Sequence, residues 1–186
     1  MGLSLLEKRM LIDGARGAVK DYLERGTLEE ASSPAQDLSK ALREVRGVFV
    51  TLYQAGKPRG CMGMPSAVLP LWQACRFCAL NAACRDPRFP PLAVEDLAGI
   101  TFEIALIGEP RPFEEVSQIR GGTCGLILQK GFRREVFMPG AFQEIAGGRE
   151  EVASSLRDTV AIDAEGADAR ETWMVFEVER WNEEDL

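Results

Sequence analysis

The sequence predicts an α+β fold, with two small mixed or antiparallel sheets, flanking helices and two intimately packed subdomains. Three observations support this class. Two pairs of β-forming segments are each joined by a short turn, which is typical of hairpins. Segments with helical periodicity separate the hairpins without the regular alternation of βαβ units. Residues 109–125 are rich in turn-forming types and mark the break between the two subdomains.

The first element is an amphipathic helix over residues 4–25. Its apolar side chains recur at helical spacing and form one stripe, made of Leu5, Ile12, Ala15, Val19, Tyr22 and Leu23, with Leu11 and Ala18 beside it. Gly26 is the predicted stop, because glycine readily adopts the left-handed conformation that ends many helices. Residues 27–37 then form a polar connection, and residues 38–45 supply one or two loose helical turns.

The first hairpin pairs a strand at 47–53 with a return strand at 58–64. Alternation along the first strand places Val48, Val50 and Leu52 on one face and Phe49, Thr51 and Tyr53 on the other. Apolar side chains on both faces predict an interior strand. Pro58 has no backbone N–H, so it is expected at the start of the return strand or on a sheet edge.

A second helix is predicted over residues 69–85, with a start at Pro70. The proline-rich segment Asp86–Pro91 ends this helix. A turn of helix near residues 94–97 then leads to a strand at 100–107, in which apolar residues alternate with polar ones.

The rest of the chain contains a second hairpin, a helix and a final strand. The hairpin pairs residues 126–129 with 133–138, the helix covers 149–160, and an acidic, exposed segment follows at 164–171. The final strand, 172–180, is expected to point Met174, Phe176 and Val178 inward and Glu177 and Glu179 outward.

The composition argues against two classes of partner. The 186 residues carry a net charge of −7, with 46 % apolar and 27 % charged residues. This charge opposes binding to nucleic acid and to anionic membranes, since both attract clustered Lys and Arg. No run of about 18 apolar residues predicts a transmembrane helix, and the N-terminal residues lack the order of a signal peptide. We therefore expect no nucleic acid and no membrane as a partner.

The counts of cysteine and histidine narrow the chemistry further. Five cysteines without an export signal favour reduced thiols in the cytoplasm. The chain has no histidine, which excludes Cys–His and Ser–His–Asp catalysis and any histidine ligand to a metal. Any group that acts as a general acid or base must therefore be a carboxylate, Lys, Tyr or Cys side chain, or belong to a bound partner.

The main candidate site is the stretch Arg59-Gly60-Cys61-Met62-Gly63 in the return strand. Residues two apart on a strand share a face, so Arg59 and Cys61 are expected to point the same way. A guanidinium beside a thiol favours the nucleophilic thiolate, and Gly60 and Gly63 leave room for a ligand at the backbone. In the alternative, Cys61 is a small buried residue in a tightly packed strand.

The segment that ends the second helix offers a second pair of alternatives. Arg88, with Asp86 beside it, joins Arg59 as a clamp for an anionic ligand, since guanidinium groups match carboxylate and phosphate oxygens. Otherwise the segment only terminates the helix, and Phe89 fills a core.

The remaining candidates favour structural roles. Cys75, Cys78 and Cys84 have a metal-like spacing, but they lie in a helix and no histidine is available, so core packing is favoured and no metal site is predicted. The loop Gly121–Gly125 is a weak anion-binding motif that precedes a strand. The small basic cluster of Lys130, Arg133 and Arg134 fits a solvated hairpin end.

Four blocks of residues occur in a fixed order along the chain. They are Gly47–Leu52, Arg59–Gly63, Asp86–Pro91 and Gly125–Leu128. Together they resemble the AMMECR domain family, also described as protein A of the AmmeMemoRadiSam system, over residues 5–181. The resemblance implies one domain over 1–186, with two subdomains, in an intracellular protein. It implies as partners a Memo-like protein related to extradiol dioxygenases and a radical S-adenosylmethionine protein. It supplies no reaction, and the cofactor stays unknown.

The sequence departs from the family pattern at four places. Pro58 replaces a Leu before Arg59, Met64 stands where the family often has Thr, Cys124 takes the position of a His, and the residues after Pro139 are atypical. A role of that histidine, or of the lysine in a later Lys-Ala-Gly-Leu stretch, therefore cannot be carried over to this chain.

Two functions follow from these features. The first is a small-ligand-binding protein or thiol-dependent accessory enzyme in a radical- or redox-linked pathway, with Cys61 as the reactive group and Arg59 orienting an anion. The second is a non-catalytic protein-interaction module in which the same stretch is structural. A reachable Cys61 and an Arg59 unpaired by protein carboxylates would favour the first function.

Overall fold

The computed structural model describes residues 2–26, 38–66, 68–119, 123–139, 141–142, 148–159 and 170–186. The chain divides into two compact units, one formed by Met1–Ile107 with Arg180–Leu186 and the other by Gly108–Glu179. The predicted connection at 27–37, two glycines of the loop Gly121–Gly125 and most of the acidic segment 164–171 lie outside the described residues.

Helix α1 (Leu5–Arg25) opens the first unit and ends as predicted at Gly26, whose φ is 73°. A capping box starts it, because Ser4 and Glu7 each accept a hydrogen bond from the other's backbone N–H. The predicted stripe is buried along the middle of the helix, at Leu11, Ile12, Ala15, Ala18 and Val19. Leu5, which was expected in the stripe, is 69 % exposed, so the buried face does not reach the first turn.

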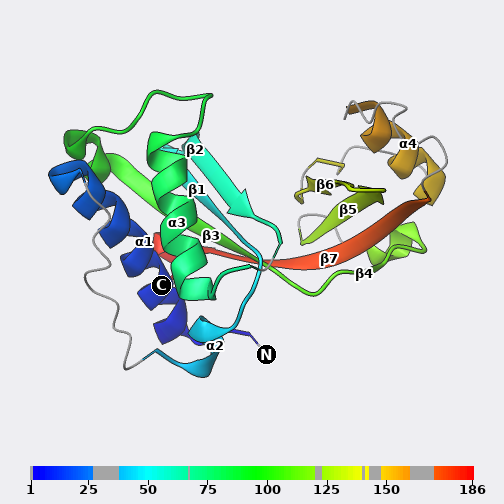
Figure 1. Ribbon diagram of the computed structural model, residues 1–186, viewed down its shortest axis with the longest axis horizontal. Helices are drawn as coiled ribbons and strands as arrows, with labels where there is room; N and C mark the ends of the chain where they lie inside the picture. The colour runs from blue at the N-terminus through cyan, green and yellow to red at the C-terminus, as the bar shows by residue number, and fades with distance from the viewer. Residues whose placement is uncertain are drawn as a thin grey trace. The chain divides into compact units, whose positions relative to one another are not determined.

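Three antiparallel strands of the sheet lie wholly in this unit, with β1 (Val48–Gln54) between β2 (Lys57–Met64) and β3 (Ile100–Ile107). The predicted interior position of the first strand is thus confirmed. Helix α3 (Leu71–Cys84) packs against β1, β2 and α1, and Figure 1 shows α1 and α3 together beside this sheet. The short helix α2 (Lys40–Arg43) and the 3-10 helix η1 (Val94–Gly99) complete the unit.

The core of the first unit explains why β1 alternates so strictly. Val48, Val50 and Leu52 are fully buried, and they join the apolar residues of α1 and α3 in one cluster. Phe49, Thr51 and Tyr53 lie on the other face and are partly exposed. The sheet therefore has one face in the core and one face that carries polar side chains near the solvent.

The second unit contains β4 (Arg111–Pro112), β5 (Cys124–Lys130), β6 (Arg133–Phe137), helix α4 (Arg149–Thr159) and most of β7 (Glu171–Asn182). Its core is a second cluster that includes Phe113, Leu126, Phe137, Leu156 and Trp173. Strand β7 was expected to bury Met174, Phe176 and Val178 only. Phe176 and Val178 are buried, but Met174 is partly exposed, and Trp173 and Val175 on the opposite face are buried because they join the core of the second unit.

The α+β class is confirmed, but the prediction of two sheets is wrong. The described strands form one seven-stranded sheet in the order β2-β1-β3-β7-β5-β6, with β4 also paired to β7. The cause is the length of β7, whose 12 residues pair with β5 over Glu171–Glu177 and continue into the first unit at Arg180. The intimate packing of the two subdomains stays a prediction. No helix within the described ranges is long and apolar enough to cross a membrane.

Candidate functional site

Cys61 lies in the middle of β2, which is the last strand of the sheet order and therefore an edge strand. It pairs across the ladder with Thr51 of β1, and the Thr51 hydroxyl donates a hydrogen bond to the Cys61 sulfur at 3.3 Å. The residue is partly exposed and its thiol is free. Cys61 is thus reachable from solvent, and its sulfur is oriented by a neighbouring side chain.

Asp86 covers the outer side of the edge strand at this point. Its Oδ2 accepts a hydrogen bond from the backbone N–H of Cys61 at 2.8 Å. The side chain of Arg88 donates to both carboxylate oxygens of Asp86, at 2.9 and 2.7 Å, and the Arg88 N–H donates to Oδ1 at 3.1 Å. The Asp86 side chain is only 3 % exposed. The fork of Arg88, followed by the N–H groups of Cys61 and Arg88, holds the pKa of this carboxyl well below its usual range.

Arg88 is linked to Cys61 through Asp86, whose carboxylate binds both the Arg88 guanidinium and the Cys61 N–H. The Arg88 side chain is 63 % exposed and its guanidinium lies 5.5 Å from the ring centre of Phe89. The Asp86 carboxylate raises the pKa of Arg88 most strongly, and the nearby Cys61 makes a smaller contribution in the same direction. The segment does follow the end of α3 at Cys84, as the structural alternative predicted, but Phe89 is partly exposed and Leu92 is the residue that joins the core.

Arg59 lies at an irregularity of the ladder. The register shifts between Leu52 and Tyr53, which pair with Gly60 and Pro58, so Arg59 has no partner residue in β1. Simple alternation therefore does not hold here, and the shared face of Arg59 and Cys61 stays a prediction. The Nη1 atom of Arg59 is buried and has no hydrogen-bond partner in the described part of the chain. No protein carboxylate within that part pairs with this side chain.

The two glycines of the motif lie where neighbouring groups fill the space of a side chain. A Cβ at Gly60 would lie 2.2 Å from the carbonyl oxygen of Ala82 in α3. A Cβ at Gly63 would lie 2.1 Å from the ring of Phe49. Both glycines therefore have a packing role, one under a helix and one under an aromatic ring. Their predicted role in shaping a ligand pocket stays a prediction.

Three residues near Cys61 were not predicted as site residues from the sequence, although the alternation of side chains along their strands gave information on the face they occupy. Thr51 pairs with Cys61 on one side and with Glu103 of β3 on the other, so thiol, hydroxyl and carboxylate form a row across three strands. Tyr53 lies one position along the same face, and its hydroxyl donates to Glu103 at 3.5 Å. Burial, and then the charge of Glu103, raise the pKa of Tyr53. Alternation placed Thr51 and Tyr53 on the face opposite Val48, Val50 and Leu52, but the register between the strands was needed to align them with Glu103.

Two of the three helix cysteines lie in a hydrophobic core, as the sequence favoured. Cys75 and Cys78 belong to the core of the first unit, and burial raises the pKa of the Cys78 thiol to about 12. Cys84 is partly exposed. Within the described residues no three His, Cys, Asp or Glu side chains are grouped so that they could hold a metal ion.

The glycine-rich loop is shorter than expected, because Cys124 is already the first residue of β5 and pairs with Glu177. Gly125 also belongs to this strand, and a Cβ there would lie 2.2 Å from the ring of Phe176. The basic cluster of Lys130, Arg133 and Arg134 lies at the hairpin end beside the fully exposed Phe132.

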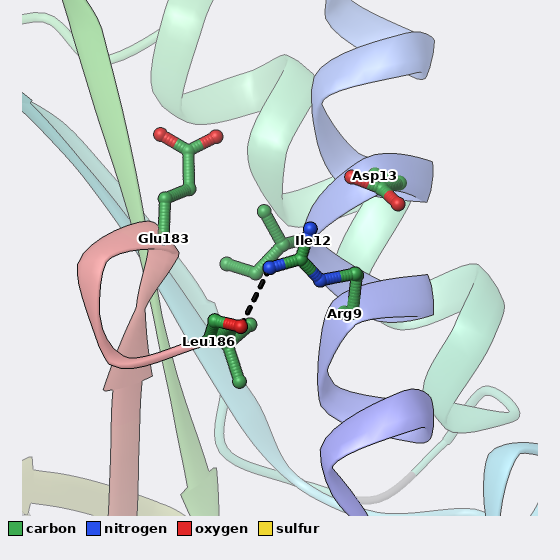
Figure 2. Close-up of a pocket in the computed structure, with 5 residues that line it drawn as sticks. All are labelled: Arg9, Ile12, Asp13, Glu183 and Leu186. Carbon is green, nitrogen blue, oxygen red and sulfur yellow. Dashed lines mark hydrogen bonds between the residues drawn. The ribbon is translucent and has the colours of Figure 1, made fainter.

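One small pocket of about 170 Å³ lies elsewhere in the first unit. Figure 2 shows Arg9 and Asp13 of α1, with Glu183 and Leu186, around a hollow that Ile12 also lines. Arg9 donates a hydrogen bond to the carbonyl oxygen of Leu186 at 2.6 Å. Glu183 is held by Arg16 through two contacts of 2.8 Å. None of the predicted site residues lines this pocket.

Comparisons with known proteins match most of the chain. The sequence model of the AMMECR1 family matches residues 12–181. A protein of Methanothermobacter thermautotrophicus is 39 % identical over 155 residues, which cover 80 % of this chain and 79 % of that one. Protein MJ0810 of Methanocaldococcus jannaschii is 33 % identical over 74 % of this chain and 70 % of its own. The crystal structure of the uncharacterized protein PH0010 from Pyrococcus horikoshii covers 98 % of this chain and 94 % of its own, with a TM-score of 0.80 and 27 % identity.

Proposed function

Since the chain belongs to the AMMECR1 family, we propose that it binds a small ligand at Cys61, as a ligand-binding protein or thiol-dependent accessory enzyme of a radical- or redox-linked pathway. One observation carries this proposal. Cys61 is partly exposed, its sulfur accepts a hydrogen bond from Thr51, and its N–H donates to the Asp86 carboxylate, which also binds the guanidinium of Arg88. A donor and a cation beside a thiol both stabilise the thiolate, which is the nucleophilic form.

The charges around Cys61 support a ligand with an anionic group. Arg88 uses one side of its fork on Asp86, but most of its side chain is open to solvent, at 63 % exposure. Arg59 has a buried Nη1 atom that meets no acceptor among the described residues. A buried donor without a partner is costly unless something binds it, so a carboxylate or phosphate oxygen is the natural acceptor.

Thiol labelling tests this proposal. The accessible thiols are alkylated with iodoacetamide and with iodoacetate at several pH values in the wild type and in Cys61→Ser. Cys84→Ser is the matched control, since Cys84 is the other partly exposed cysteine. We expect a fast alkylation phase at neutral pH that Cys61→Ser removes and Cys84→Ser retains. The ratio of the iodoacetate rate to the iodoacetamide rate should be higher for this phase than for a free thiol in solution. A fast phase that survives in Cys61→Ser would contradict the reactive-thiol function.

A specific observation supports the second function, a protein-interaction module without catalysis. The space that a side chain would occupy at each glycine near Cys61 is already filled, by Ala82 at Gly60 and by Phe49 at Gly63. In this case the stretch would be structural. The Memo-like and radical S-adenosylmethionine partners implied by the resemblance are proposals under either function. The interaction module would be favoured if Cys61→Ser leaves the formation of a complex with such a partner unchanged and if the Cys61 thiol is alkylated slowly.

A cytoplasmic location is part of the same proposal. All five cysteines are free thiols, which supports a reducing compartment. Fluorescence microscopy or fractionation of the tagged protein tests this point, and recovery from an oxidising compartment would contradict it.

A further inference from the structure

Strands β2 and β6 are the two ends of the described sheet order, so each has one side without a neighbouring strand among the described residues. The two edges differ in what they offer to another chain. At β2 the Asp86 carboxylate already accepts the outward N–H of Cys61, at 2.8 Å, and the Asp86 side chain is only 3 % exposed. A buried carboxylate in the place of a pairing strand closes the β2 edge at this point, and its charge repels an acidic strand.

The register of the β5–β6 hairpin shows which groups of β6 face outward. Lys130 and Arg133 flank a two-residue turn and are direct partners, which makes them a hydrogen-bonded pair. Every second residue of β6 therefore turns its N–H and C=O away from β5, and these residues are Arg134 and Val136. No backbone hydrogen bond from another segment within the described ranges reaches either of them. The β6 edge thus offers two donors and two acceptors to a further strand.

The turn of the same hairpin presents an aromatic ring to the solvent. Phe132 is fully exposed, and Gly131 before it has a φ of 58°, which two-residue hairpin turns favour at their first position. The side-chain amide of Gln129 donates to the carbonyl oxygen of Gly131 at 2.5 Å and so fixes the turn. The ring is therefore held in a defined place, where it can serve as the aromatic anchor of an interface.

Basic side chains surround this ring. The three cations of Lys130, Arg133 and Arg134, with the carboxylate of Glu135, give the hairpin end a charge of +2 in a chain whose net charge is −7. Cations on an edge strand protect it from aggregation, but an exposed ring beside them acts in the opposite direction. Both features are explained by an acidic partner, which the cations attract and which buries the ring of Phe132.

We propose that the β6 edge binds an extended acidic segment of a partner protein, which adds to the sheet as a further strand beside Arg134 and Val136 and packs an apolar side chain on Phe132. A protein segment is favoured over a membrane or a nucleic acid, because only a peptide backbone matches the alternating donors and acceptors of a strand edge. The inference goes beyond the proposed function of Cys61, since it concerns the second unit and needs no reactive thiol.

Fluorescence anisotropy with a labelled peptide tests the inference on the full chain. The probe is an octapeptide of alternating Glu and Val, which is acidic on one face and apolar on the other when extended. One matched probe alternates Lys and Val, which reverses the charge. Another is the Glu–Val octapeptide with every amide N-methylated, which keeps the charge but cannot donate to a strand. We expect binding of the first probe that weakens at high salt, and at least tenfold weaker binding of the other two.

Four variants locate the bound probe. Phe132→Ser should weaken binding about tenfold and leave the urea midpoint unchanged, because the exposed ring has no packing to lose. Arg134→Gln removes a charge and should weaken binding about threefold, whereas Arg134→Pro also removes the outward N–H and should weaken it at least tenfold. Lys57→Gln is the matched control, with the same loss of charge at the end of the other hairpin, and should change nothing.

The other outcomes overturn the inference. Absence of binding of the Glu–Val octapeptide would do so directly, and equal binding of the N-methylated probe would mean that charge alone holds the peptide. A loss in Lys57→Gln but not in Arg134→Gln would place the peptide at β2. Binding to phosphatidylserine vesicles that depends on Phe132, without binding of the octapeptide, would make the hairpin a membrane anchor.

The thiol function is measured separately in the same variants. Alkylation of Cys61 should be unchanged in Phe132→Ser, because the hairpin belongs to the second unit and Cys61 to the first. A failure of peptide binding with normal alkylation overturns this inference alone, and slow alkylation with normal peptide binding contradicts only the reactive thiol.

Discussion

Replacement of Gly60 by alanine tests why a glycine precedes Cys61. The new Cβ would lie 2.2 Å from the Ala82 carbonyl oxygen and 3.0 Å from its carbonyl carbon. Ordinary van der Waals contact begins near 3.4 Å, so the strand and α3 would have to separate by about 1.2 Å. Both obstructing atoms are backbone atoms of a buried helix, which cannot turn aside as a side chain does. We expect a loss of about 3 kcal/mol in the free energy of unfolding, at the upper end of overpacking costs.

Urea denaturation measures this loss. With a slope of about 2 kcal/mol per molar urea, the midpoint should fall by about 1.5 M in Gly60→Ala. Gly63→Ala is the comparison at the same strand, because its obstacle is the ring of Phe49, which can rotate, and a smaller loss is expected. Gly17→Ala in α1 is the control, since nothing lies within 4 Å of its Cβ and the helix should gain stability. An unchanged midpoint in Gly60→Ala would refute the close approach of α3 to β2.

Three further predictions concern the surroundings of Cys61 and the first helix. The pKa of Asp86 is lowered in the folded state from about 3.8, so its stabilising effect is complete above about pH 5 and is lost as the pH falls below 4. In Asp86→Asn the urea midpoint should therefore fall less between pH 6 and pH 2 than in the wild type, and an equal fall in both proteins would contradict this. Thr51→Val removes the hydrogen-bond donor to Cys61 and should slow the alkylation of Cys61 at pH 7 about threefold to tenfold, with the circular dichroism spectrum unchanged. Equal alkylation rates in the variant and the wild type would show that the hydroxyl does not act on the sulfur. Ser4→Ala removes the cap of α1 and should cost about 1 kcal/mol in urea denaturation, whereas no change would mean that the cap contributes nothing.

Local patterns in the sequence predicted most of the elements correctly. Alternation in β1 identified Val48, Val50 and Leu52 as core residues, and the end of α1 at Gly26 followed from the backbone preference of glycine. These predictions succeeded because they depend on periods of two or 3.6 residues within one segment. The family was also accessible from the sequence, since short blocks in a fixed order are a property of the chain alone.

Other features depended on contacts between distant segments. The single sheet arises because β7 finds partners on both sides along its length, which its own pattern does not encode. The bulge at Arg59 broke the alternation on which its orientation was predicted, because a register shift is a property of two strands.

For the candidate site, the sequence determined the residue types, and tertiary structure decided which of them meet. The absence of histidine and the motif around Cys61 led to the hypothesis of a thiol activated by charge, which stays a prediction. The fold placed Asp86 on the N–H of Cys61, bound Arg88 to that carboxylate and aligned Thr51 with Glu103. Such neighbours come from separate strands and loops, and only the register of the ladders and the packing of the segment after α3 set the distances between them.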